Sequence, residues 1–137
     1  MKKERKESMG IEPKVIAVGG IFFYSENIEK TNEWYQKNLG FEINSWGSAS
    51  FDLKDEKNAE VINPLQWKTF KKENKHFAPS KKGFMINYQV QNLEGLISQL
   101  KKNKVEILDD LTTFDYGKFA YIMDCDGNKI ELWEPIL

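Results

Sequence analysis

The sequence is poor in the two residue types that most often carry metal and redox chemistry. Its 137 residues include one cysteine, Cys125, and one histidine, His76. A single cysteine excludes an intrachain disulfide and is typical of proteins of the reducing cytoplasm. No apolar run approaches the ~20 residues that a membrane-spanning helix needs, and no signal-peptide-like stretch follows the basic residues 1–8. We therefore predict a cytoplasmic protein with no membrane partner.

An excess of charge of either sign is also missing. The chain has 20 basic and 21 acidic side chains and a formal net charge of -1. A nucleic-acid-binding protein needs a positive field around the phosphates, so we predict no nucleic-acid partner. Apolar material, in contrast, is plentiful, because 40% of the residues are hydrophobic and 13% are aromatic. This is enough for one folded domain whose core needs no disulfide.

Patterned segments divide the chain into two similar halves. We interpret residues 1–13 as an N-terminal tail and residues 14–137 as a single domain. The domain consists of module one (14–63), a connection (64–83) and module two (84–137). The connection is rich in lysine and lacks a clear hydrophobic period, which favours a solvated surface segment.

Each module shows the same order of elements. An apolar strand leads to a helix that begins after an asparagine N-cap, Asn27 or Asn92. Gly40 suits the position just past the first helix, and Asp126-Gly127 suits a hairpin turn. Three strands are expected after each helix, over residues 41–47, 48–54 and 59–63 and over residues 104–108, 116–124 and 129–134. Each module is thus β-α-β-β-β, and we predict an α+β fold in which two modules form curved mixed sheets around a cavity.

Two segments carry a resemblance to a known family: "SENIEKTNEWYQKNLGF" (25–41), at the first strand–helix–strand junction, and "DCDGNKIELWEP" (124–135), at the last hairpin. Over residues 14–135 the chain resembles the vicinal oxygen chelate superfamily, which includes glyoxalase, bleomycin-resistance proteins, fosfomycin-resistance enzymes and extradiol dioxygenases. The resemblance implies this superfamily's fold, a small-molecule ligand and a homodimer.

The resemblance also implies where a metal would bind, because ligands in the superfamily's metalloenzymes come from the first and last strand of each module. Counting back from the helix caps places the first-strand positions on Gly20 and Met85. Aligning "EVINP" with "ELWEP" places the last-strand positions on Glu60 and Glu131. Glycine offers no donor and a thioether is a poor ligand for Zn, Ni or Fe, while His76 is interpreted as a surface or loop histidine. We therefore predict no metal and no cofactor.

Strand alternation predicts which side chains line the cavity. Ile130 and Leu132 face the core, so Glu131 faces the cavity together with Trp133. The predicted ligand-binding residues are Phe22, Tyr24, Trp46, Glu60, Met85, Asn87, Gln89, Glu131 and Trp133. A wall of aromatic, amide and acidic groups suits an organic molecule, and carboxylates beside rings suit a cation. Alternatively, the aromatic side chains only fill space between sheets.

These features leave three functions open. We favour a glyoxalase/bleomycin-resistance-like protein that binds a small organic molecule in a metal-free cavity. The alternative is a lyase or isomerase of the glyoxalase type. It would use Glu131 as a catalytic general base sharing the cavity with Glu60, or hold a divalent metal through a non-standard ligand set. The third is a structural or regulatory module whose cavity is filled by side chains.

Overall fold

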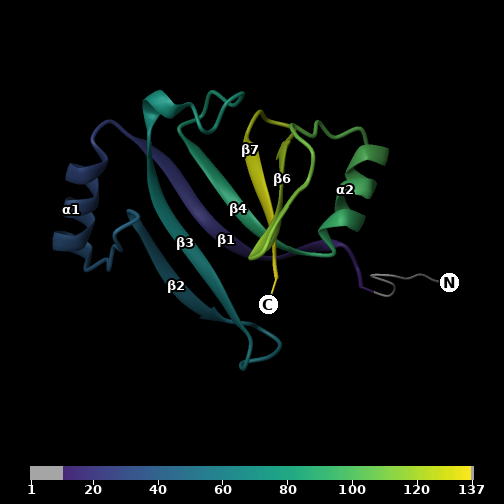
Figure 1. Cartoon of the computed structure of the whole chain (residues 1–137), viewed down its shortest axis with the longest axis horizontal. Helices are drawn as coiled ribbons and strands as arrows, with labels where there is room; N and C mark the ends of the chain where they lie inside the picture. The colour runs from purple at the N-terminus through teal and green to yellow at the C-terminus, as the bar shows by residue number, and fades with distance from the viewer. Residues whose placement is uncertain (1–10, 137) are drawn as a thin grey trace.

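The structure, a computed structural model, describes residues 11–136, so the first ten residues of the predicted tail lie outside the described part. Its elements in chain order are β1 (Lys14–Ser25), α1 (Ile28–Leu39), β2 (Ser48–Lys54), β3 (Ile62–Lys71), the 3-10 helix η1 (Lys72–Asn74), β4 (Phe84–Gln91), α2 (Leu93–Lys102), β5 (Thr112–Phe114), β6 (Gly117–Met123) and β7 (Lys129–Pro135). The strands form one mixed sheet in the order β2-β3-β1-β4-β7-β6-β5, and the helices flank it (Figure 1). None of the described helices is long and apolar enough to cross a membrane.

The two helices begin where the sequence predicts. The Asn27 side chain accepts a hydrogen bond from the Lys30 backbone N–H at 3.0 Å, and the Asn92 side chain accepts one from Gly95 at 3.1 Å. These bonds satisfy N–H groups that have no partner within the first helical turn. Gly40 closes α1 with a φ of 72°, in the left-handed region that favours glycine. The α+β class is confirmed.

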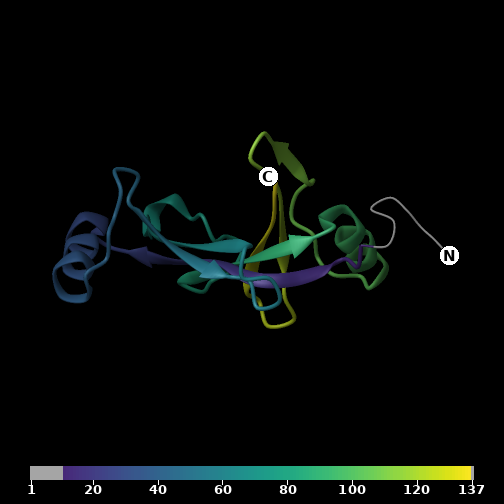
Figure 2. The same ribbon diagram turned by 90° about the horizontal axis from the view of Figure 1, so that it is seen from below.

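The two modules meet edge to edge in the middle of the sheet, where β1 and β4 pair in antiparallel fashion. Gly20 lies opposite Asn87 in this pair, and the register shifts between Val18 and Gly20, so Gly19 is the extra residue of a bulge. The outer neighbours of the central pair, β3 and β7, run parallel to β1 and β4. Seen from below, β1 to β4 lie in a nearly flat layer while β6 and β7 stand steeply across it (Figure 2).

Three of the expected strands differ from the structure. The predicted connection 64–83 is wrong in its first part, because β3 continues to Lys71 and pairs with β1. Trp67 and Thr69 on β3 are buried, while the lysines between and after them are not. The segment therefore has the alternation of a strand, but its high lysine content resembles that of a solvated loop. Residues 41–47 form no strand, and residues 104–108 contribute only an isolated bridge between Ile107 and Ile122.

The two faces of the sheet carry different side chains. On the helix-bearing face, an aliphatic core packs under α2 and an aromatic group packs under α1, where Phe23, Tyr35 and Trp67 lie with ring centroids 4.7–6.1 Å apart. On the opposite face a second core forms around Phe22, Phe77, Met85, Tyr24, Phe70 and Tyr121. This second face is the one that carries Glu131.

Candidate functional site

Glu131 lies in β7 between Asn87 of β4 and Tyr121 of β6, which are its partners in the sheet register. The Asn87 amide donates a hydrogen bond to Oε1 at 2.7 Å, and the Tyr121 hydroxyl donates one to Oε2. The side chain is 9% exposed and has no ion-pair partner within 4 Å among the described residues. A buried carboxylate is therefore held by two neutral donors, which is less than full compensation for its lost hydration.

Two further polar atoms on this face have no hydrogen-bond partner among residues 11–136: the Asn87 carbonyl oxygen Oδ1 and the Trp133 indole Nε1, both buried. Glycines allow both side chains to sit where they do. A Cβ added at Gly19 would clash with Asn87 Oδ1, and one added at Gly117 would lie 2.6 Å from Trp133 Nε1. The close approach of backbone to side chain thus requires glycine at both positions.

A cavity of about 280 Å³ opens beside Glu131. The rings of Phe114 and Tyr116 stack at 5.4 Å between centroids, and Phe119 meets each of them edge-on at 6.0 Å. Phe119 also lies parallel to Trp133 at 6.1 Å. The complete lining is Thr112, Phe114, Tyr116, Phe119, Tyr121 and Glu131. Such a cavity presents aromatic faces and one acid to whatever enters it.

The groups around Glu131 keep defined protonation states. Burial, followed by the Glu131 charge, raises the pKa of Tyr121 well above its ordinary value, so its hydroxyl stays protonated and donates. Burial lowers the pKa of Lys129, whose amine lies 4.7 Å over the Tyr121 ring and donates to the His76 carbonyl at 2.9 Å. Burial and then Lys129 lower the pKa of His76, although Glu131 raises it, so His76 is neutral at pH 7.

His76 and Phe77 follow η1 and fold onto this face. The His76 ring stacks on Phe70 at 4.5 Å, and Phe77 is 0% exposed, stacked on Tyr24 at 4.2 Å. His76 lies in the loop after η1, as its interpretation as a surface or loop histidine allows, but it is not at the surface, because its ring is half-buried and Glu131 is close enough to act on its pKa. The last part of the connection therefore covers one end of the face that carries Glu131.

The structure brings most of the predicted site residues to one face but not all of them. Met85, Asn87, Gln89 and Glu131 are buried there, with Phe22, Tyr24 and Trp133 beside them. Of this set, only Glu131 lines the cavity itself. Trp46 is 80% exposed in the loop that follows α1 and lies apart from the site.

Glu60 is also misplaced by the sequence alignment. It lies exposed in the turn before β3, with its N–H bonded to the Asn58 side chain at 3.1 Å. Strand pairing identifies the true counterpart of Glu131. Asn87 pairs with Glu131, Phe22 occupies the same place relative to its helix cap as Asn87, and Phe22 pairs with Lys68. Module one therefore places a lysine where a carboxylate was expected, and the shared Glu60–Glu131 cavity is wrong.

Sequence reasoning missed the aromatic residues of the cavity. Phe119 and Tyr121 could have been found, because the turn at Asp126-Gly127 sets the register of the last hairpin and places them opposite Trp133 and Glu131. No such signal marks Phe114 and Tyr116. β5 is only three residues long, and the turn to β6 has only two residues, Asp115 and Tyr116.

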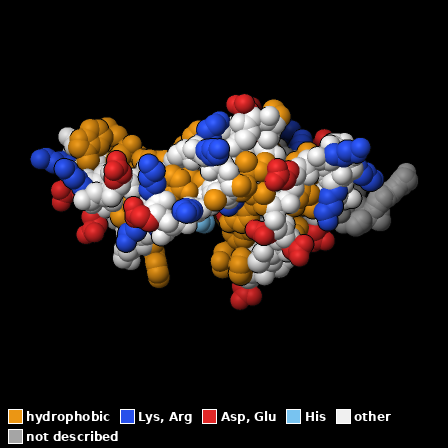
Figure 3. Space-filling model, turned by 90° about the horizontal axis from the view of Figure 1, so that it is seen from above, with side chains coloured by type: hydrophobic (Ala, Val, Ile, Leu, Met, Phe, Trp, Pro, Cys, Tyr) orange, Lys and Arg blue, Asp and Glu red, His pale blue; other side chains and the backbone are white. Residues whose placement is uncertain are grey.

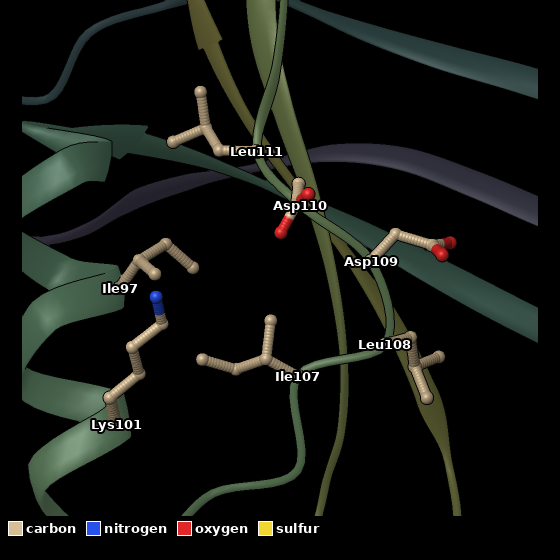
Figure 4. Close-up of a pocket in the computed structure, with 7 residues that line it drawn as sticks. All are labelled: Ile97, Lys101, Ile107, Leu108, Asp109, Asp110 and Leu111. Atoms are coloured by element: carbon tan, nitrogen blue, oxygen red, sulfur yellow. The ribbon is translucent and has the colours of Figure 1, made fainter.

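Hollows larger than the one beside Glu131 lie elsewhere in the described chain, and two of them are as follows. A cavity of about 420 Å³ opens between α2 and residues 107–111 on the helix-bearing face, where Ile97, Ile107 and Leu111 belong to the aliphatic core (Figure 4). Another, of about 640 Å³, is lined by Tyr24 and by the lysines 72, 75, 81 and 82. In Figure 3, Lys and Arg side chains are spread over the face that is seen, at both ends as well as in the middle. Neither hollow includes Glu131.

The donor set does not fit the metal that the superfamily's enzymes bind. At the first-strand positions, Gly20 has no side chain and Met85 offers a fully buried thioether. The last-strand positions hold Glu131 and, in place of Glu60, a lysine. Within residues 11–136 no three His, Cys, Asp or Glu side chains come close enough together to hold a metal ion.

Comparison with known families and structures agrees with this architecture. The family model of the glyoxalase/bleomycin resistance protein/dioxygenase superfamily matches residues 17–132. The chain belongs to this superfamily. No curated protein matches the chain.

Similar solved structures show the superfamily fold at low sequence identity. A variant of Streptomyces coelicolor methylmalonyl-CoA epimerase in complex with 2-nitronate-propionyl-CoA is 17% identical, with a TM-score of 0.64, covering 90% of this chain and 100% of that one. The Mycobacterium tuberculosis methylmalonyl-CoA epimerase is 21% identical, with a TM-score of 0.58 and 90% of each chain covered. A superfamily member from Vibrio splendidus 12B01 is 15% identical, with a TM-score of 0.56, covering 90% and 99%.

Proposed function

We propose that this superfamily member binds a small organic molecule in the cavity beside Glu131. The observation that carries the proposal is a 280 Å³ cavity lined by four aromatic rings, with a buried carboxylate that has no ion-pair partner in the described chain. Aromatic walls with a few polar groups are the usual composition of small-molecule sites. The Glu131 carboxylate, held in place by the Asn87 amide, would orient the ligand. The cytoplasmic location stays a prediction.

A fragment screen by ligand-observed NMR tests this proposal. We expect fragments with a planar apolar body to bind, and their affinity to fall at least about tenfold when Phe114 and Tyr116 are both replaced by alanine, since these rings form the mouth. Trp34→Ala is the matched control, because Trp34 is an exposed ring on α1, away from the cavity. Fragments that bind the double variant as well as the wild type would contradict the proposal.

A second candidate is a lyase or isomerase in which Glu131 is the general base. The favouring observation is that a carboxylate and a protonated phenol, Tyr121, share one hydrogen bond at the edge of the cavity. Each carboxylate oxygen accepts one hydrogen bond and keeps a second lone pair, so Glu131 can take a proton without losing either bond. A bound fragment that exchanges a carbon-bound proton for deuterium with wild type, and not with Glu131→Gln, would favour this candidate.

We also infer that the protein is a homodimer, as the resemblance implies. Val15, Val18 and Ile21 of β1 lie on the helix-bearing face, opposite Val90, Tyr88 and Ile86 of β4, and all three are exposed. α1 has no buried residue. An apolar strip left uncovered between two helices is typical of an interaction surface.

Light scattering after size exclusion tests the dimer. We expect a mass of twice 16.0 kDa for the wild type, and a shift towards the monomer for Val18→Lys with Ile21→Lys, because two buried charges would oppose association. Val61→Lys, at an exposed apolar residue near the β2–β3 turn, is the control. A monomeric wild type would refute the inference.

A further inference from the structure

We propose that the group held in this cavity is an organic cation, such as an alkylammonium, with Glu131 as its counter-ion and the rings of Phe114, Tyr116 and Phe119 as its walls. The inference rests on the proposed function and adds the chemical class of the ligand. It follows from three observations: the unpaired acid, the sign of the charges around it, and the arrangement of the rings.

Glu131 is a buried acid that has no cationic partner within the described chain. Glu131 is almost fully buried, and its two hydrogen bonds come from an amide and a phenol that carry no charge. A carboxylate removed from water is stabilised much more by a cation than by neutral donors. The carboxylate faces the cavity, so a ligand that carries a positive charge can supply the missing partner.

The charges near the cavity point the same way. No basic side chain lines it. The amine of Lys129 lies over the Tyr121 ring and donates to the His76 carbonyl, and it makes no ion pair within 4 Å with Glu131. Burial sets the direction of the pKa shift of both Tyr121, which is raised, and Lys129, which is lowered; Asp109, like Glu131, adds a negative charge that favours the protonated form of each. An anionic ligand would therefore be repelled at the position where a cation is attracted.

The rings of Phe114, Tyr116 and Phe119 offer faces to which a cation can bind. Phe114 and Tyr116 are 45% and 63% exposed, and Phe119 stands edge-on to both. In the part of the chain that the structure describes, the cation–π contacts involve Phe70 and Tyr121, so the faces of the three wall rings carry no cation of the protein itself. Several ring faces beside a carboxylate form the kind of cage that recognises ammonium groups. A neutral ligand could stack here, but it would leave Glu131 without a counter-charge.

A pair of probes of equal shape separates charge from size. Choline and 3,3-dimethylbutan-1-ol differ in a quaternary nitrogen replaced by carbon, and benzyltrimethylammonium adds an aromatic body. We expect titration calorimetry on the full chain to show choline binding at least about tenfold more tightly than the alcohol. Benzyltrimethylammonium should bind more tightly than choline, because its ring can also stack on the cavity wall.

Two variants assign the effect to the site. Glu131→Gln should lose most of the preference for choline, whereas Glu60→Gln, which changes the net charge equally in an exposed turn, should not. Glu131→Gln is compatible with the fold, because the Asn87 amide can turn so that its unpaired Oδ1 accepts from the new amide. Phe114→Leu keeps the apolar volume without a ring face, so it should weaken choline binding and leave the alcohol unchanged. Phe114 is half-exposed, so this second test does not depend on the Glu131 variant folding.

The outcomes separate this inference from the proposed function. If the alcohol binds as tightly as choline while fragments still bind at Phe114 and Tyr116, the cation assignment is wrong and small-molecule binding stands. If choline binds equally well to Glu131→Gln and to wild type, the assignment is also wrong. If neither the probes nor any fragment binds, the proposed function fails and the inference with it.

Discussion

Phe77→Ala is expected to lower the free energy of unfolding by about 3–5 kcal/mol, the range for removing a fully buried phenylalanine. Phe77 is 0% exposed and stacks on Tyr24 at 4.2 Å, with Phe70 edge-on at 5.5 Å. Its backbone N–H also donates to the Tyr24 hydroxyl at 2.8 Å. Removing the ring leaves a void between the segment that follows η1 and the sheet, so the segment loses the side chain that anchors it.

Urea denaturation of the wild type and of the Phe77→Ala variant measures this loss of unfolding free energy. Phe84→Ala is the matched control, because Phe84 begins β4 and is 41% exposed, so its removal should cost about 1 kcal/mol or less. Equal losses for the two variants would mean that residues 75–80 do not pack as described. Phe77 lies in a stretch that the sequence favoured as solvated surface, which makes its stability effect a sharp test of the fold.

The fold could be predicted largely from local signals. Asn27, Asn92 and Gly40 mark helix ends by hydrogen bonding and backbone conformation, and both requirements are local. These signals occur twice in the sequence and therefore predict two modules. In the structure, the first strands of the two halves, β1 and β4, pair with one another. The extent of β3 could not be predicted in the same way. Its strand character comes from pairing with β1, some 46 residues away in sequence, and its lysines resemble a surface segment.

The site was predictable where strand alternation applies. Asn87, Glu131 and Trp133 share one face because their strands alternate regularly and pair in parallel register. The predicted place of Glu60 is wrong because it rests on the sequence similarity of two short segments, whereas strand pairing puts Lys68 at the position that corresponds to Glu131. Phe114 could not be found, since a strand of three residues has too little alternation to assign a face. The local sequence pattern is thus enough to predict the place of Glu131, whereas the place of the Phe114 ring depends on tertiary structure.

Asn87→Asp is expected to destabilise the protein strongly at neutral pH. The introduced aspartate would have the shape of asparagine but would replace the donating amide by a second carboxylate oxygen, 2.7 Å from Glu131 Oε1 in a buried place. Two carboxylates so close cannot both be ionised, so the pair holds a proton and its pKa rises. A rise of about two pKa units corresponds to about 3 kcal/mol of stability lost at neutral pH.

The pH dependence of this loss has a definite sign. Because the folded-state pKa of the pair lies above its unfolded value of about 4, the folded variant binds the proton more tightly. The variant should therefore be close to wild type below about pH 4 and fall behind it as the pH rises through the folded pKa. Urea midpoints of variant and wild type, compared at each pH, measure the difference. A difference that does not change with pH would contradict the buried contact between Asn87 and Glu131.

Asn128→Asp provides the matched control. The Asn128 amide donates to Asp124 at 2.8 Å, so this substitution also places two carboxylates side by side, but at the base of a turn where both side chains are partly exposed beside Lys82. Water and the lysine screen the repulsion there, and the loss should stay below about 1 kcal/mol. A large effect at Asn87 with a small one at Asn128 would show that burial, and not proximity alone, sets the cost.

The double variant Asn87→Asp with Glu131→Gln completes the test. The exchange moves the carboxylate to β4 and the amide to β7, so the introduced glutamine can donate to the introduced aspartate from the position of Oε1 and accept from Tyr121 at the position of Oε2. Every hydrogen bond is kept, so most of the stability lost in Asn87→Asp should return. The negative charge, however, would lie farther from the rings of β5 and β6, because Glu131 and not Asn87 lines the cavity. A stable double variant that no longer prefers choline would therefore separate the folding role of this hydrogen-bonded pair from its role towards a ligand.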